Sequence, residues 1–190
     1  MMIKKGLLLA LMFIGIKSTL IMAQNPTLET IFKRKSVRSY TEQPVSNDDL
    51  VLLVKAGMAA PTGMNRQPWE FLVIQDKAKM VELSSKLPYG LMMKDAQALI
   101  VIIGNPETSP YWFLDCSAAA QNILLAAESI GLGAVWTAGY PYEDRMDAIA
   151  SAFSIPSPYR PLCAIPIGYP KGEQTPKDKW KKEKLHMNEW

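Results

Sequence analysis

The chain has 190 residues, of which 48% are hydrophobic and 21% charged, so it is long enough for one domain with a substantial buried core. The first 23 residues carry three of the 21 basic side chains and no acidic one, so the remainder has 18 basic and 18 acidic side chains. The alkaline pI of the full chain is therefore no evidence for a nucleic-acid partner, and we expect none.

The first 23 residues have the pattern of a secretory signal peptide. Lys4 and Lys5 precede an apolar run over residues 6–16, and Ala23 is a small residue before the expected cleavage. The run is too short to span a membrane readily. We therefore predict a signal peptide over residues 1–23 and one domain over residues 24–190, in a periplasmic or secreted protein with no stable membrane insertion. The alternative is an uncleaved anchor or an ordered apolar helix, which would leave the protein cytoplasmic.

The first half of the domain is predicted to be mostly helical. Residues 25–35 form a helix that begins at Asn25 and Pro26. Ser46 is a good N-cap for a second helix that runs to about Ala59. A loop, a strand and an amphipathic helix follow, over residues 61–68, 69–75 and 77–87.

The second half is predicted to contain two buried strands. Residues 98–104 (ALIVIIG) form a continuous apolar run, which is typical of a strand buried on both faces. Residues 142–153 are predicted to be a helix, and residues 162–168 the last buried strand. The chain from residue 169 onward is rich in Lys and Pro.

A long helix is predicted over residues 111–131, where Asp115 and Glu128 are the only charged side chains. A helix that is apolar on nearly all sides must be covered on nearly all sides. Burial in a dimer interface is the favoured account of this helix, and a core helix of a monomer is the alternative.

The cysteines and the histidine limit the possible chemistry. Cys116 and Cys163 lie in apolar segments, so they fit buried thiols, although export would permit a disulfide. No Cys or His spacing indicates a metal site. His186 is the only histidine and lies in the polar tail, so a Ser-His-Asp or Cys-His mechanism has no candidate base.

Two basic clusters are candidates for binding an anion. Arg34, Ser36 and Arg38 combine guanidinium donors with a hydroxyl, a set that suits a phosphate group. Lys177 and Lys179 stand in the tail. Basic runs of this kind are more often solvated surfaces, so both interpretations remain open for each cluster.

Two further segments are candidates for holding a flat polar ligand. Residues 60–71 combine two prolines, a glycine and amide or hydroxyl side chains in a stiff loop and the start of the strand that follows, although a structural turn explains the loop equally well. Residues 131–139 (GLGAVWTAG) lack the glycine spacing of a dinucleotide fingerprint and resemble a helix C-cap that leads into a strand. The backbone at residues 137–139 could let a planar ring approach closely.

These segments stand in the order found in the nitroreductase family, and the resemblance covers about residues 25–184. The RxSxR pattern at residues 34–38 resembles the family's FMN-binding opening. PTGMNRQPWEF resembles its proline-containing loop, GLGAVWTAG its flavin-side strand, and IGYPKGE followed by PKDK its closing segment. The resemblance implies an α+β fold of three α/β/α layers, a mostly antiparallel sheet and an intertwined homodimer with two FMN sites.

The resemblance also implies a set of cofactor-binding positions. They are Arg34, Ser36, Arg38, Pro61, Thr62, Gly63, Asn65, Thr137, Ala138, Gly139, Lys177 and Lys179. Arg34, Ser36 and the two lysines would hold the phosphate, and Arg38 would lie at the pyrimidine edge of the flavin. Residues 61–65 would come from the second subunit, and residues 137–139 would lie near N5.

Two positions depart from the family pattern. Many members have arginine where Lys179 stands, so its phosphate contact would be monodentate. Many have glutamate where Ala138 stands, so a side-chain contact near N5 would be missing. Substrate-pocket residues between 87 and 98 cannot be transferred, and Lys94 is a further candidate there.

The implied activity is ping-pong transfer of hydride from NADH or NADPH, through FMN, to a small acceptor such as a nitroaromatic or quinone. No catalytic acid or base and no metal is assigned. Alternatives are a dehalogenase or flavin-modifying enzyme of the same superfamily, a flavin carrier or sensor without turnover, and an interaction protein that binds no flavin.

Overall fold

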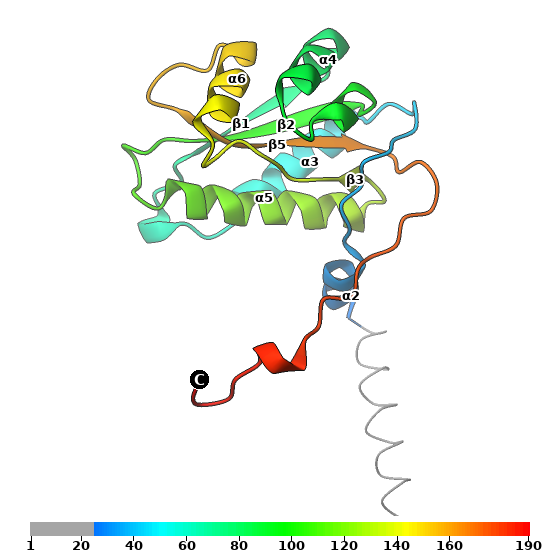
Figure 1. Ribbon diagram of the computed structural model, residues 1–190, viewed down its shortest axis with the longest axis vertical. Helices are drawn as coiled ribbons and strands as arrows, with labels where there is room; N and C mark the ends of the chain where they lie inside the picture. Colours follow the sequence, from blue (N-terminus) through cyan, green and yellow to red (C-terminus); the bar gives the residue numbers. More distant parts are fainter. Residues whose placement is uncertain (1–24) are drawn as a thin grey trace, which may run out of the picture.

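The computed structural model describes residues 25–190, so the predicted signal peptide lies outside the described residues. Three layers make up the fold, with a central sheet between two layers of helices (Figure 1). Within the part of the chain that is described, no helix is long and apolar enough to cross a membrane. The expected α+β, three-layer architecture is confirmed.

The sheet is antiparallel throughout and has the strand order β1-β2-β5-β3, with β4 also paired to β5. The strands are β1 (Trp69–Ile74), β2 (Ala98–Gly104), β3 (Gly133–Ala134), β4 (Thr137–Ala138) and β5 (Arg160–Gly168). Every residue of β2 is buried, as its apolar run predicts. Ile100 and Ile102 pack into one core cluster and Leu99 and Val101 into another, because alternate side chains point to opposite faces.

The described residues form five α-helices, four of which cover the two faces of the sheet. They are α2 (Pro26–Lys33), α3 (Asn47–Met58), α4 (Lys77–Lys86), α5 (Trp112–Ser129) and α6 (Glu143–Phe153). In Figure 1, α4 and α6 lie on one face of the sheet and α3 and α5 on the other. The predicted N-cap is confirmed, since Ser46 Oγ accepts a 3.0 Å hydrogen bond from the backbone N–H of Asp49.

Three predicted boundaries were wrong by two residues, and one of them is the end of the long helix, which lies at Ser129 and not at residue 131. Helix α2 ends at Lys33 and not at Lys35, because the chain turns away there and Val37 N–H donates to the Ala134 carbonyl. Strand β5 begins at Arg160 and not at residue 162, because pairing with β2 continues past a bulge. The predicted flavin-side strand is interrupted, and only β3 and β4, of two residues each, are regular.

Helix α5 is only half covered within the chain. Cys116, Ala120 and Ile123 are fully buried against the sheet. On the opposite side, Leu114 is 55% exposed, and three partly or fully exposed residues, Ala118, Gln121 and Leu125, continue the same stripe at helical spacing. A core helix of a monomer would bury this stripe, so the monomer alternative accounts for only one side of α5.

Both thiols are buried and free, as expected from their apolar segments. Burial and, to a smaller extent, the nearby Asp115 carboxylate raise the pKa of the Cys116 thiol to about 12. Burial also raises the pKa of Cys163 well above its ordinary value. Neither thiol is therefore a nucleophile at neutral pH.

Candidate functional site

The first and last predicted clusters meet in one groove of about 870 Å³ beside α2. Its lining includes Arg34, Ser36, Arg38, Lys177 and Lys179. The first three belong to the extended segment after α2, and the two lysines belong to the C-terminal tail, which runs past α2 in Figure 1. The structure therefore brings together two clusters of side chains that lie about 140 positions apart in the sequence.

The extended segment is fixed to the sheet by its alternate residues. Val37 is fully buried, and its N–H donates to the Ala134 carbonyl of β3 at 3.0 Å. The Tyr40 hydroxyl donates to the Val37 and Pro166 carbonyls, at 2.7 and 3.2 Å. Because successive residues of an extended chain point to opposite sides, anchoring Val37 leaves Ser36 and Arg38 directed outward.

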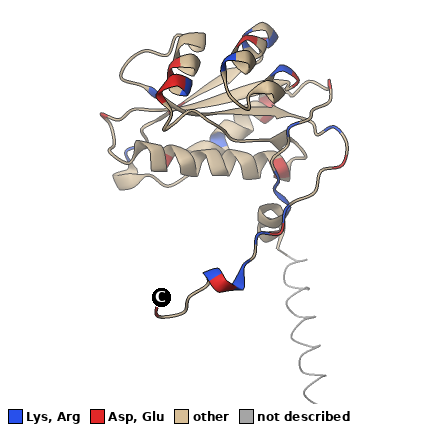
Figure 2. Cartoon of the chain, in the orientation of Figure 1, with Lys and Arg blue, Asp and Glu red and all other residues tan. Residues whose placement is uncertain are grey.

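The groove is strongly cationic. Its charged side chains are Arg34, Lys35, Arg38, Lys177 and Lys179, against the single carboxylate of Asp178. Figure 2 shows these basic positions along the segment after α2 and along the tail, beside an α5 that carries almost no charge. Arg34 and Lys177 form no ion pair with any residue in the range 25–190. A site of this kind suits a dianionic phosphate.

Tyr40 and Arg38 influence each other at the edge of the groove. Burial raises the pKa of the Tyr40 phenol well above its ordinary value, and the nearby Arg38 guanidinium lowers it by a smaller amount. The phenol therefore stays protonated at neutral pH and keeps its two donor contacts to the backbone.

The third cluster lies on and after β4, and none of residues 137–139 lines the groove. Strand β4 pairs Thr137 with Ala164 and Ala138 with Cys163, and Gly139 N–H donates to the Leu162 carbonyl. A Cβ at Gly139 would lie 3.0 Å from the Pro161 carbonyl oxygen, so the backbone is closely packed there. Thr137 Oγ1 is buried and has no hydrogen-bond partner among the described residues.

The second cluster is held in a strained loop. Met64, Asn65 and Gln67 all have positive φ, at 52°, 54° and 47°. Left-handed backbone at non-glycine residues is costly and gathers at functional sites. The buried Asp115 carboxylate fixes this loop, because it accepts hydrogen bonds from Gly63 N–H at 3.0 Å and Ser109 Oγ at 3.2 Å.

Within one chain, this loop does not reach the groove. The loop is tied to Asp115 at the start of α5, whereas the groove is tied to Glu128 at its end through Lys35. The two acids are 13 residues apart, which is about 20 Å along a helix axis. Figure 1 shows the loop and α2 at opposite ends of α5. Pro61, Thr62, Gly63 and Asn65 are therefore separated from the predicted phosphate-binding residues of the groove.

Lys94 also lies outside the groove. It lines a separate polar cavity of about 720 Å³ together with Lys77 and Lys171. The structure therefore does not bring Lys94 to the groove, and its predicted role near a substrate gains no support from the groove residues.

Sequence reasoning missed Asp115 and Glu128 as organising residues. Both stood out as the only charges in an otherwise apolar helix. That isolation was a usable signal, because a charged side chain on a buried helix needs a partner. The partners, Gly63 N–H and Lys35, are 52 and 93 positions away, and spacing alone does not identify them.

The residues present fit FMN. A guanidinium, a hydroxyl and two ammonium groups match a phosphate, and the unpartnered Thr137 hydroxyl beside a tight backbone matches the polar edge of a planar ring. The described residues contain no group of acidic, Cys or His side chains that could hold a metal.

The chain matches known proteins over most of its length. Residues 31–87 and 76–169 match the model of the Nitroreductase family. A candidate NADH dehydrogenase/NAD(P)H nitroreductase of Archaeoglobus fulgidus is 36% identical over 170 residues, which cover 86% of this chain and 98% of the relative.

Two solved structures show the same fold. A candidate NADH dehydrogenase/NAD(P)H nitroreductase from Bacteroides thetaiotaomicron is 49% identical, with a TM-score of 0.86 over 87% of this chain and 99% of that chain. A candidate nitroreductase from Desulfovibrio desulfuricans, solved in complex with FMN, is 30% identical, with a TM-score of 0.76 over 88% and 99% of the two chains. This chain therefore belongs to the nitroreductase family.

Proposed function

We propose that the protein is an FMN-dependent oxidoreductase that passes hydride from NADH or NADPH to a small acceptor such as a nitroaromatic or quinone. The observation that carries this proposal is the groove in which Arg34 and Ser36 meet Lys177 and Lys179. Family membership and the FMN complex of the Desulfovibrio relative support it.

The phosphate of FMN would be held by four groups. Arg34 supplies a planar pair of donors, Ser36 a hydroxyl, and Lys177 and Lys179 one point charge each. Lys179 makes a single-donor contact, where an arginine could make two. Because the groove is cationic while residues 24–190 are neutral overall, the attraction for a dianion is local to this site.

The flavin ring would lie between the extended segment and β4. Arg38 would place a cation near the pyrimidine edge, where negative charge develops on reduction. The buried Thr137 hydroxyl, which has no partner among the described residues, would gain one from the ring, and the backbone of residues 137–139 would lie beside it. Ala138 offers no carboxylate near N5, so only backbone donors act there.

The complete site would need two copies of the chain. A two-fold axis perpendicular to α5 reverses the helix, so the start of one α5 lies beside the end of the other. This arrangement would bring Pro61, Thr62, Gly63 and Asn65 of one subunit to the groove of the other. It would also cover the exposed α5 stripe that includes Leu114.

FMN, when bound, supplies the chemistry of accepting and donating hydride. The protein's residues bind the phosphate, compensate charge through Arg38 and leave an open face where donor and acceptor stack in turn. We assign no residue as a catalytic acid or base, because the flavin supplies the chemistry. Sequential use of one face predicts ping-pong kinetics with parallel double-reciprocal lines, and intersecting lines would contradict it.

The visible absorption spectrum of purified residues 24–190, before and after anaerobic addition of NADPH, tests the proposal. Flavin bands that bleach are the expected result. Bands that persist would favour a carrier or an enzyme with another electron donor. A colourless protein that does not take up added FMN would refute the proposal.

We also propose that the protein is exported and cleaved after Ala23. The basic start, the short apolar run and a family match that begins at residue 31 support this proposal. Nicotinamide donors are intracellular, so an exported enzyme would need a reductant outside the cytoplasm. N-terminal sequencing of the native protein tests it, and an intact Met1 on cytoplasmic protein would refute it.

A further inference from the structure

One ion pair connects the groove to α5. Lys35 Nζ lies 2.8 Å from Glu128 Oε1, and the two side chains are 21% and 14% exposed. The other ion pairs among residues 25–190 all have at least one side chain more than half exposed. The Lys35–Glu128 pair is therefore the most buried of those described.

Glu128 occupies an unfavourable place for an acid. It lies in the last turn of α5, where the helix dipole disfavours negative charge, and it is largely buried. Removing one partner of such a pair leaves an uncompensated charge. The contact with Lys35 offsets both penalties.

The pair holds the backbone at the phosphate-binding residues. Lys35 stands between Arg34 and Ser36, and α5 is fixed by fully buried residues such as Ile123 and Ala127. Glu128 is therefore held in place by its helix, and its contact with Lys35 restrains the short segment that carries Arg34 and Ser36. Val37, bonded to Ala134, is the next restraint along the chain.

We infer that Glu128 is a positioning residue for the cofactor: through Lys35, it sets the place of Arg34 and Ser36 and thereby the affinity for the FMN phosphate. This inference rests on the proposed function. Glu128 itself contacts no cofactor, and Lys35 is engaged by Glu128 and is not a phosphate ligand.

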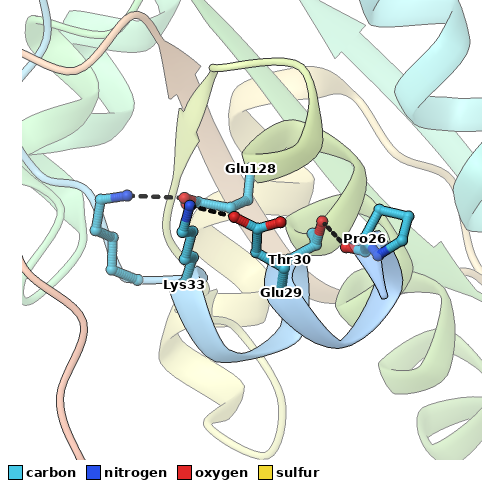
Figure 3. Close-up of polar contacts among 6 residues, drawn as sticks. Pro26, Glu29, Thr30, Lys33 and Glu128 are labelled. Carbon is cyan, nitrogen blue, oxygen red and sulfur yellow. Dashed lines mark hydrogen bonds and ion pairs between the residues drawn. The ribbon is translucent and has the colours of Figure 1, made fainter. Parts of the chain in front are cut away.

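A matched control lies on the neighbouring helix. Lys33 and Glu29 form an i,i+4 pair on the surface of α2, with side chains 64% and 46% exposed. Figure 3 shows this pair close to Glu128. Glu29→Gln and Glu128→Gln thus remove the same charge from the same region, but only the second removes the link to α5.

The test compares FMN with riboflavin, which lacks the phosphate. For Glu128→Gln we expect FMN binding about tenfold weaker, or about 1.4 kcal/mol, with riboflavin binding within about twofold of wild type. Glu29→Gln is expected to leave both affinities unchanged. Electrostatics alone predicts the opposite sign, because removing a carboxylate near the groove would tighten FMN binding.

Glu128→Asp provides a second variant that keeps the charge but shortens the side chain. Its FMN binding is expected to weaken by about threefold, with riboflavin binding close to that of wild type. Equal losses for FMN and riboflavin in both Glu128 variants would indicate a general structural role and overturn the inference. FMN affinities of the Glu128 variants equal to that of Glu29→Gln would also overturn the inference. If the wild-type chain bound no FMN, the proposed function would fail first and the inference with it.

Discussion

Gly133 is the position where one added methyl group tests the docking of the phosphate-binding segment. An ideal Cβ at Gly133 would lie 2.5, 2.7 and 2.8 Å from Cγ1, Cβ and Cγ2 of Val37. Ordinary carbon contacts are about 3.5–4.0 Å, so Gly133→Ala overlaps three carbons by about 1 Å. Val37 is fully buried, and rotation about its χ1 does not move its Cβ, so a change of rotamer alone does not relieve the overlap.

The overlap must therefore be relieved by moving the backbone of the segment. Overpacking of this size costs about 1–3 kcal/mol. For a protein of this length each kcal/mol lowers the melting temperature by about 2–4 °C, so we expect a loss of roughly 2–12 °C. The Val37–Ala134 hydrogen bond of 3.0 Å would lengthen, and FMN binding would weaken because Ser36 and Arg38 shift with Val37.

Gly131→Ala is the matched control two residues earlier. Gly131 has φ of +79° and no atom within 4 Å of the added Cβ, so its cost is backbone strain alone, about 1 kcal/mol. Its FMN affinity should equal that of wild type. Thermal unfolding of the FMN-free chains and FMN titration by flavin fluorescence measure both quantities.

The reasoning would be refuted if Gly133→Ala melted and bound FMN like wild type, or if Gly131→Ala lost as much FMN affinity. Adding Val37→Ala to Gly133→Ala removes both Cγ atoms but leaves the Cβ at 2.7 Å. The double variant should therefore recover only part of the lost stability.

Three further predictions concern other parts of the molecule. Thr137→Val removes a buried hydroxyl that has no partner among the described residues. The free energy of unfolding of the FMN-free chain, measured by denaturant titration, should therefore rise by about 1 kcal/mol, while FMN binding weakens. A lower free energy of unfolding would contradict this prediction. Leu114 is 55% exposed in one chain, so Leu114→Glu should leave the circular dichroism of the chain intact. The same change should halve the molecular mass measured by light scattering and abolish FMN binding. An unchanged dimer would exclude the proposed interface. Burial raises the pKa of Cys116 from 9.0 to about 12 and also raises those of Cys163 and Tyr40 well above their ordinary values, so these groups ionise first in the unfolded chain. Their contribution to the free energy of unfolding should therefore be fully present well below pH 9 and should be lost as pH rises toward 12, and equal free energies of unfolding at pH 8 and 11 would show otherwise.

The helices and long strands were predictable because their signals are local. Ser46 caps α3 through a hydroxyl three residues from its donor, and the apolar run of β2 allows only a doubly buried strand. The two-residue strands β3 and β4 were not predictable, because two residues show no periodicity. They exist because β5 offers them backbone partners.

The candidate site was predictable in its parts but not in its arrangement. Arg34 and Lys177 could be identified from residue types, but their meeting in one groove depends on the path of the tail beside α2. The separation of Gly63 from that groove depends on which end of α5 binds each segment. These are tertiary contacts between distant positions, and no local pattern encodes them.

The placement of loop and groove at opposite ends of α5 has a consequence for mixtures of defective chains. If each site takes its groove from one subunit and its loop from the other, Arg34→Ala and an inactivating change at Asn65 damage complementary halves. A mixed dimer then has one site with both defects and one site with neither. Random reassociation of two inactive proteins would restore activity to about a quarter of all sites, since about half of the dimers are mixed and each carries one intact site.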